Sequence, residues 1–208
     1  MEKQVSTILF DLGGVLLNLD YNLTINAFKK LGKGNFEKMY SQAKQNSIFD
    51  QLETGEISAQ EFRDNIRSFL GEEVTDEMMD KAWNAMLLDF PIERIKLLRN
   101  LKEKYQIILF SNTNIIHYKK FREIIKNTFG DENLLENIFD KTYYSHVLGK
   151  RKPNQDAFKF ILEEMSLQPN EVVFVDDSLQ HVQGAKEIGI DARHLIGMDI
   201  VTLCKEFI

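Results

Sequence analysis

The chain has 208 residues, of which 43% are hydrophobic and 28% are charged, so it can bury one sizeable core and lacks the composition of a disordered protein. Its formal net charge of -6 disfavours a nucleic-acid partner, because binding to a phosphate backbone relies on clustered Lys and Arg. No apolar run approaches the roughly 18 residues of a membrane helix, and the run after Lys3 ends at Asp11, so neither a membrane anchor nor an export signal is expected.

The first predicted element is a strand at residues 5–10, a short run of β-branched and apolar residues. After it, apolar residues recur at helical spacing only. Ser58 and Glu61 form a capping box at the start of one predicted helix, and Thr75 begins another. We therefore expect a purely helical segment over residues 18–88, inserted after the first strand.

Four further short apolar runs follow the predicted insertion, and each is followed by turn-forming residues. They cover residues 106–110, 141–144, 172–175 and 190–194. Helical patterns lie between them, so strand and helix alternate as in a parallel sheet. The predicted fold class is α/β, with a Rossmann-like parallel sheet core built from residues 1–17 and 89–208 and an α-helical cap at residues 18–88.

Polar residues follow the first four predicted strands, in the place where open parallel sheets bind their ligands. They are, in chain order, Asp11, Ser111, Asn112, Lys152, Asp176 and Asp177. Because the carboxyl ends of parallel strands share one edge of the sheet, we expect these side chains to lie close together. Their chemistry suits a phosphate ester.

Each of these residue types has a function in phosphoryl transfer. A carboxylate such as Asp11 can attack phosphorus and form an aspartyl-phosphate. Oxygen ligands from Asp11, Asp177 and a backbone carbonyl suit Mg²⁺, which would offset the repulsion between carboxylate and phosphate. Ser111 and the amides near Asn112 would bind the phosphoryl oxygens. Lys152 would balance the negative charge of the transition state.

These segments, in this order, resemble the four motifs of the haloacid dehalogenase-like hydrolase superfamily. The first motif, a strand followed by DxDx[TV], is matched by residues 11–15 except at its second Asp, where this chain has Gly13. Ser111 matches the second motif, and Asp176 with Asp177 matches the fourth. The third, S-x-x-x-G-x-x-K-P, is matched by Ser145, Gly149, Lys152 and Pro153. The helical insertion also resembles the family's cap, which lies between the first and second motifs.

The resemblance implies a Mg²⁺-dependent phosphatase that acts on a small phosphorylated metabolite. Finer sequence detail is similar to bacterial sugar-phosphate phosphatases and to the phosphatase domain of soluble epoxide hydrolases. Asp11 and Lys152 would be catalytic, and Asp11, Asp177 and the carbonyl of Gly13 would bind the metal. Asp176 would lie behind these ligands and support Lys152.

Other expectations concern the setting of the protein. Its single cysteine, Cys204, cannot form a disulfide within the chain, which agrees with a reducing cytoplasm. We expect a monomer or a weak dimer whose partner is a small phosphorylated substrate. Lys150 and Arg151 are expected to belong to a solvated loop.

Gly13 is the main departure from the family pattern, because the missing Asp is the usual general acid and base. General acid–base assistance is typically worth about 10²–10⁴-fold in rate. By their position near the motif ends, four residues are candidate replacements: Asn18, Asp20, His117 and His181. Two other functions stay open. One is a phospho-ligand binding protein with little turnover, and the other is a metal-independent haloacid dehalogenase, against which the Asp176–Asp177 pair argues.

Overall fold

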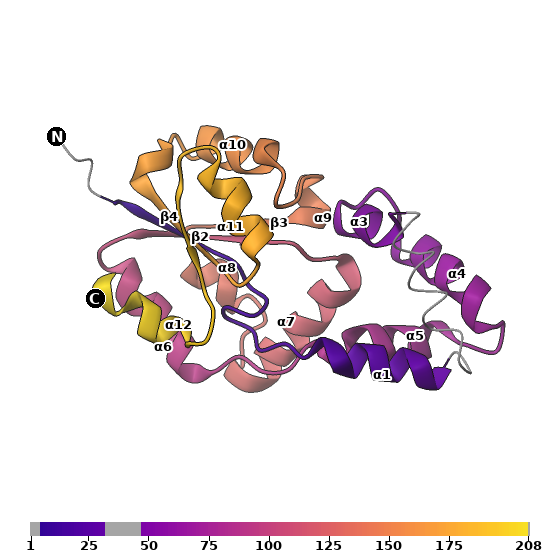
Figure 1. Ribbon diagram of the computed structural model, residues 1–208. Helices are drawn as coiled ribbons and strands as arrows, with labels where there is room; N and C mark the ends of the chain where they lie inside the picture. The colour runs from indigo at the N-terminus through magenta and orange to yellow at the C-terminus, as the bar shows by residue number, and fades with distance from the viewer. Residues whose placement is uncertain (1–4, 32–46, 208) are drawn as a thin grey trace.

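Five parallel strands form the single sheet of the computed structural model, which describes residues 5–31 and 47–207 (Figure 1). The strand order is β3-β2-β1-β4-β5. The strands are β1 (Thr7–Phe10), β2 (Gln106–Ser111), β3 (Lys141–Tyr144), β4 (Val172–Asp176) and β5 (Asp191–His194). The predicted α/β class with a parallel sheet is confirmed. β3 has the predicted range, and the other four strands differ from theirs at one end by one or two residues, with β2 and β4 extending to include Ser111 and Asp176.

Helices cover both faces of the sheet, because successive strand residues point to opposite sides. Ile8 and Phe10 belong to the cluster under one face, whereas Leu9 belongs to the cluster under the other. The first face is covered by α6 (Ile92–Lys102), α7 (Ile115–Phe129), α8 (Leu134–Ile138) and α12 (Ile200–Leu203). The second is covered by α10 (Gln155–Glu164) and α11 (Leu179–Lys186). The short elements α9 (Ser145–Leu148) and η2 (Pro169–Glu171) lie in the connections, and η3 (Cys204–Phe207) follows α12 at the end of the described residues.

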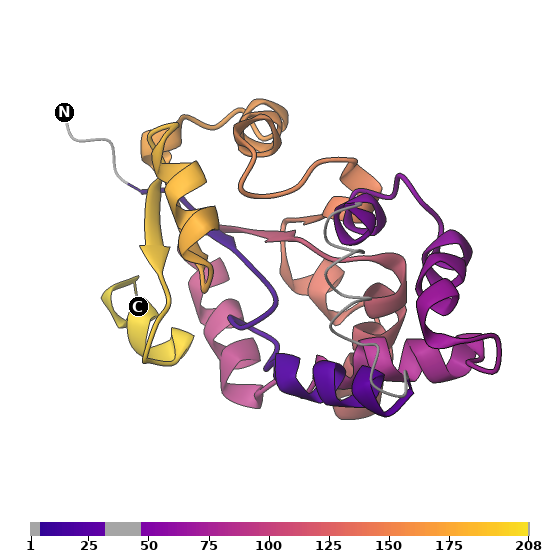
Figure 2. The ribbon, with the colours of Figure 1, turned by 45° about the vertical axis from the view of Figure 1, so that its right-hand side comes forward.

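The described chain between β1 and β2 is helical up to α6, as the sequence predicts, and it has its own hydrophobic cluster. Its elements are α1 (Tyr21–Leu31), α3 (Ile48–Glu53), α4 (Ala59–Leu70), α5 (Asp76–Trp83) and η1 (Asn84–Met86). The capping box of Ser58 and Glu61 is present at the start of α4, and Thr75 caps α5. Figure 2 shows these helices beside the sheet, with α3 next to α9.

The two chain crossings between the insertion and the core lie side by side. The backbone N–H of Asn18 donates to Asp89 O, and that of Leu88 donates to Asn18 O. The predicted boundaries at residues 18 and 88 fall at this pair of crossings and stay a prediction. Residues 32–46 of the expected cap, and residues 1–4 and 208 of the expected core, lie outside the described residues. Every helix in the described part of the chain is too short or too polar to cross a membrane.

Candidate active site

A buried lysine lies between two aspartates at the carboxyl edge of the sheet. Because β1 pairs with β4 so that Phe10 faces Val175, the next residues, Asp11 and Asp176, come to the same level. Lys152 Nζ lies 2.7 Å from Asp11 Oδ1 and 2.6 Å from Asp176 Oδ2. Burial lowers the pKa of Lys152, but the two carboxylates outweigh it and hold the pKa above its ordinary value. Lys152 is therefore a fixed positive charge beside Asp11.

Asp176 accepts hydrogen bonds on both carboxylate oxygens. Its Oδ1 accepts from the backbone N–H of Ser178 at 2.7 Å, and its Oδ2 accepts from Lys152. His181 Nδ1 lies 3.0 Å from each oxygen. Burial raises the pKa of Asp176, but Lys152 and His181 outweigh it and hold the pKa at about 2. Through these hydrogen bonds the Asp176 carboxylate positions Lys152 and His181.

Three carboxylates gather at this edge and carry more negative charge than Lys152 compensates. Asp11, Asp176 and Asp177 each place an oxygen within 4.8 Å of the others. Burial raises the pKa of Asp11 to about 7, although Lys152 opposes the shift. Burial and the neighbouring Asp176 also raise the pKa of Asp177. A hard divalent cation held by carboxylate and carbonyl oxygens would offset this charge, so the cluster fits Mg²⁺.

The turn after β1 contains a glycine that lies close against the carboxylate cluster. The backbone hydrogen bonds within this turn are accepted by the carbonyls of Leu12 and Leu17, and none of them uses the carbonyl of Gly13. Gly14 has a φ of 73°, and a Cβ there would overlap the Asp177 carboxylate. A Cβ on Gly13 would meet only the side-chain end of Leu19, at 2.8 Å. The chain therefore needs glycine at position 14 but can accept a side chain at position 13.

Gly14→Ala should cost both stability and activity, whereas Gly13→Ala should cost little stability. The left-handed conformation alone disfavours alanine by about 1–2 kcal/mol, and the overlap displaces Asp177. Urea unfolding of both variants, together with the Mg²⁺ concentration for half-maximal activity, measures these effects. Equal unfolding midpoints for the two variants would contradict the close contact between Gly14 and Asp177.

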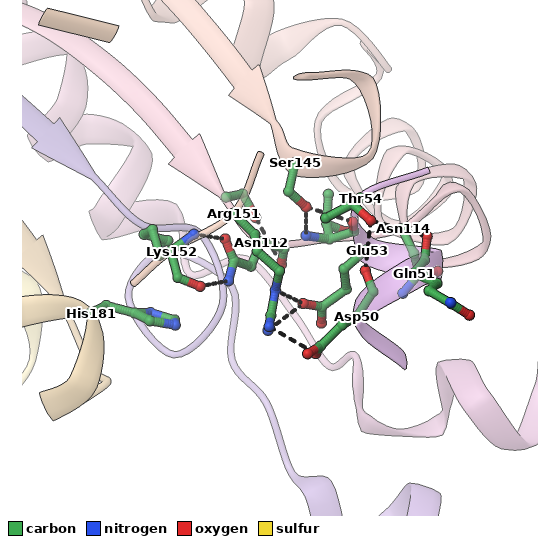
Figure 3. A network of polar contacts seen from close by, with 12 residues as sticks. Asp50, Gln51, Glu53, Thr54, Asn112, Asn114, Ser145, Arg151, Lys152 and His181 are labelled. Carbon is green, nitrogen blue, oxygen red and sulfur yellow. Dashed lines mark hydrogen bonds and ion pairs between the residues drawn. The ribbon is translucent and has the colours of Figure 1, made fainter. Parts of the chain in front are cut away.

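The loop after β2 is pinned by side-chain bonds that leave its backbone at the site. Asn112 Nδ2 donates to Lys152 O at 2.9 Å, and Asn112 Oδ1 accepts from Lys152 N at 3.0 Å (Figure 3). Ser145 Oγ bonds the backbone of Thr113 on both sides, as acceptor from N–H and donor to C=O. These bonds occupy both polar atoms of the Asn112 side chain. Ser111 is buried at the end of β2, with only a 3.5 Å contact to Asn112 O.

The four candidate replacements for the missing acid make other contacts. Asn18 Nδ2 donates to Asp89 at the crossing between insertion and core. Asp20 Oδ1 accepts from the N–H of Asn22 at the start of α1. His181 is held by Asp176 through Nδ1. Of these three, only His181 touches the group around Lys152.

His117 has both ring nitrogens in hydrogen bonds. Its Nε2 lies 3.0 Å from Trp83 O, a pure acceptor, so Nε2 carries the proton. Nδ1 then accepts from Asn114 Nδ2 at 3.1 Å, and the ring stacks on Trp83 with centres 5.0 Å apart. Burial lowers the pKa of His117 to about 4. A neutral, fully bonded ring of this kind is part of the packing and does not serve as the acid.

His117 should make the fold less stable in mild acid. The unfolded chain binds a proton near the ordinary pKa of 6.5, whereas the folded chain resists it until about 4. The contribution is therefore complete above 6.5, is lost as the pH falls towards 4, and then levels off, with a total of about 3 kcal/mol. Urea unfolding from pH 7.5 to 4 should show a steeper loss for the wild type than for His117→Gln. Parallel curves would contradict the buried neutral imidazole.

Arg151 corrects the expectation of a solvated loop. Its Nη1 lies 2.8 Å from Asp50 Oδ1, and its Nη2 lies 2.8 Å from Glu53 Oε2, so one core residue bonds two carboxylates of α3 (Figure 3). Burial raises the pKa of Glu53, and Arg151 opposes that shift. Lys150 instead pairs with the exposed Asp156. Nothing in the local Lys-Arg-Lys sequence distinguishes the two residues, because the partners of Arg151 come from the inserted helices.

Comparison with known proteins agrees with this geometry. The D-ribitol-5-phosphate phosphatase of Bacteroides thetaiotaomicron is 31% identical over 190 residues, which cover 90% of each chain. The sesquiterpene phosphatase astK of Aspergillus oryzae is 23% identical over 95% of this chain and 92% of its own. A solved HAD family enzyme from Bacteroides thetaiotaomicron, in complex with magnesium and inorganic phosphate, is 40% identical with a TM-score of 0.85 and covers 96% of this chain and 98% of its own.

The family itself matches along nearly the whole described chain. Residues 5–189 match the haloacid dehalogenase-like hydrolase family, a range that includes the inserted helices and all four motifs, from Asp11 to Asp177. The resemblance that the four motifs indicate is thereby confirmed. The chain belongs to the haloacid dehalogenase-like hydrolase family.

Proposed function

We propose that the protein is a Mg²⁺-dependent phosphatase that hydrolyses a small phosphorylated metabolite through an aspartyl-phosphate on Asp11. The observation that carries this proposal is the buried contact of 2.7 Å between Lys152 Nζ and Asp11 Oδ1, beside two further carboxylates. The named phosphatase relative at 31% identity supports the reaction class. The magnesium and phosphate bound to the solved HAD family enzyme support the cofactor.

Two steps account for hydrolysis. In the first, a carboxylate oxygen of Asp11 forms a bond to phosphorus while the bond from phosphorus to the leaving oxygen breaks. In the second, water attacks the phosphorus of the aspartyl-phosphate, which restores the Asp11 carboxylate and releases inorganic phosphate. Since Gly13 has no side chain, the leaving oxygen receives its proton from water or from another group. Substrates with good leaving groups should therefore react fastest.

The surrounding residues bind and neutralise the phosphoryl group. Lys152 stays protonated between its two carboxylates and offsets charge on the transferring group. The hydroxyl of Ser111 and the backbone amide of Asn112 would donate to phosphoryl oxygens. Asp11, Asp177 and the Gly13 carbonyl would hold Mg²⁺, whose charge offsets the repulsion between Asp11 and the phosphate when it is bound.

The inserted helices would act as the cap over this site. A cavity of about 440 Å³ lies between them and the core, within the size range of small-molecule sites. Gly13, Ser111 and Asn112 lie on its core side, and Phe49, Glu53 and Trp83 lie on the side of the insertion. We propose that the phosphate end of the substrate meets the core residues and that the remainder of the substrate occupies the cavity.

A screen of phosphorylated metabolites tests the proposal. Wild type should release inorganic phosphate from at least one small monoester in the presence of Mg²⁺, and EDTA should stop the release. The variant Asp11→Asn, measured in parallel, identifies any contaminating phosphatase. Phosphate binding without turnover across a broad panel would instead favour a binding protein, and turnover that EDTA leaves unchanged would contradict the metal requirement.

A further inference from the structure

The cavity beside the candidate active site has apolar walls on the side of the insertion. Six residues from α1, α3, α4, α5 and the segment after η1 make up much of this wall: Ile25, Phe28, Phe49, Phe62, Trp83 and Leu87. Phe49 and Trp83 are stacked with ring centres 5.3 Å apart, and Phe28 lies edge-on to Trp83. Walls of this kind gain free energy by removing apolar surface from water.

Two polar side chains of this wall, Thr24 and His117, already have partners. Thr24 Oγ1 donates to Trp83 O at 3.0 Å and accepts from Met86 N at 3.1 Å. His117 is bonded through both ring nitrogens. A ligand hydroxyl that displaced one of these bonds would break as many contacts as it formed. These two side chains are therefore poorly suited to bind a row of ligand hydroxyl groups, and among the described polar groups of the wall the buried Trp83 Nε1 is without a hydrogen-bond partner.

Charged side chains also line the cavity. Arg151 is bonded to Asp50 and Glu53 there. Tyr21, which is 58% exposed, lines it as well. The cavity thus combines apolar walls with the core residues Gly13, Ser111 and Asn112 of the candidate active site. Such a combination matches a phosphate ester with an apolar body.

We propose that the substrate of this phosphatase is a monoester of an alcohol with an apolar alkyl or aryl body and few hydroxyl groups. The inference rests on the proposed phosphatase function and narrows its substrate class. By this proposal the substrate of this chain differs from that of the relative named for D-ribitol 5-phosphate, which carries hydroxyls along its carbon chain. An apolar body occupies the space along the wall and leaves no hydroxyl without a partner. A polyol in the same place would have unpaired hydroxyls, and these would lower its affinity.

Two substrates with the same carbon skeleton test the proposal directly. We would measure kcat/KM of the wild-type enzyme at saturating Mg²⁺ for n-pentyl phosphate and for D-ribitol 5-phosphate, together with methyl, propyl and butyl phosphates. Each added methylene should raise kcat/KM by about fourfold, and pentyl phosphate should exceed ribitol 5-phosphate by at least about tenfold. A flat series, or faster turnover of ribitol 5-phosphate, would overturn the inference and leave the phosphatase proposal intact. Failure to hydrolyse any phosphate ester would overturn both.

A matched pair of variants on α1 tests whether the apolar body of the substrate contacts this wall. Ile25 lines the cavity, whereas Leu23 is 42% exposed and is not among the residues of the wall. Ile25→Gln should lower the ratio of pentyl to ribitol turnover by about fivefold or more, and Leu23→Gln should leave it unchanged. Leu87→Gln provides the same test from another wall should Ile25→Gln unfold. A ratio that is unchanged in both wall variants would show that the body binds elsewhere.

Discussion

Asp11→Asn should abolish phosphate release without loss of the fold. The substitution removes the attacking carboxylate and one proposed metal ligand but keeps the size of the side chain. Because burial and neighbouring charge raise the pKa of Asp11, an uncharged amide should also relieve repulsion in the cluster. We therefore expect activity at the level of the blank and, in EDTA, a thermal midpoint no lower than that of wild type.

The control for this variant is Asp156→Asn, since Asp156 is exposed and pairs with Lys150 away from the cluster. It should keep wild-type turnover. A substantial fraction of wild-type activity in Asp11→Asn would rule out covalent catalysis by Asp11. A large drop in the thermal midpoint would show that Asp11 supports the fold in addition to its proposed chemistry.

Lys152→Met should lower both turnover and stability. Lys152 is fully buried, so its removal leaves Asp11 and Asp176 as buried carboxylates without their shared cation. Breaking a buried ion pair in this way typically costs about 3–5 kcal/mol. We expect kcat to fall by about 10²-fold or more, in keeping with loss of a charge aimed at the transition state. Phosphate-release assays and urea unfolding measure the two effects.

Lys150→Met is the matched control, because Lys150 lies two residues away and bonds only the exposed Asp156 among the described residues. It should change the free energy of unfolding by less than about 1 kcal/mol and leave kcat near wild type. Similar losses for both lysines would contradict the assignment of Lys152, which the motif spacing favours over Lys150.

The fold could be predicted because its signals are local. Short apolar runs ending at Asp11, Ser111 and Asp176 predict parallel strands, and a parallel sheet brings their carboxyl ends together without any knowledge of packing. Charge reasoning also predicts the pairing of Asp176 with Lys152, which the structure shows at 2.6 Å. Two adjacent acidic residues at a buried edge need a cation, and the third motif offers the lysine.

The contacts between insertion and core could not be predicted in the same way. From the local sequence Arg151 is expected to lie in a solvated loop, but in the structure α3 places Asp50 and Glu53 against it. From the sequence His117 is a candidate acid, but in the structure Trp83 and Asn114 hydrogen-bond both of its ring nitrogens. In each case a partner from the inserted helices lies tens of residues away in the chain, and no local pattern indicates which helix face meets the core.

The same reasoning bears on the alternative functions. The dehalogenase reading needs an Asp nucleophile but no metal, and three carboxylates around one lysine leave negative charge that a cation would offset. A phospho-ligand binding protein would need no nucleophile, so it differs from the proposal at Asp11, whereas a dehalogenase differs from it in the metal requirement.

Trapping the enzyme during its first turnover tests the central claim most directly. Wild type mixed with Mg²⁺ and a phosphate ester labelled at phosphorus would be quenched in acid at successive times and reduced with borohydride, which converts an aspartyl-phosphate to homoserine. The account predicts label on the enzyme in the first turnover and homoserine at position 11, with neither in Asp11→Asn or in EDTA. Release of phosphate with no labelled enzyme at any time, or label on another residue, would contradict it.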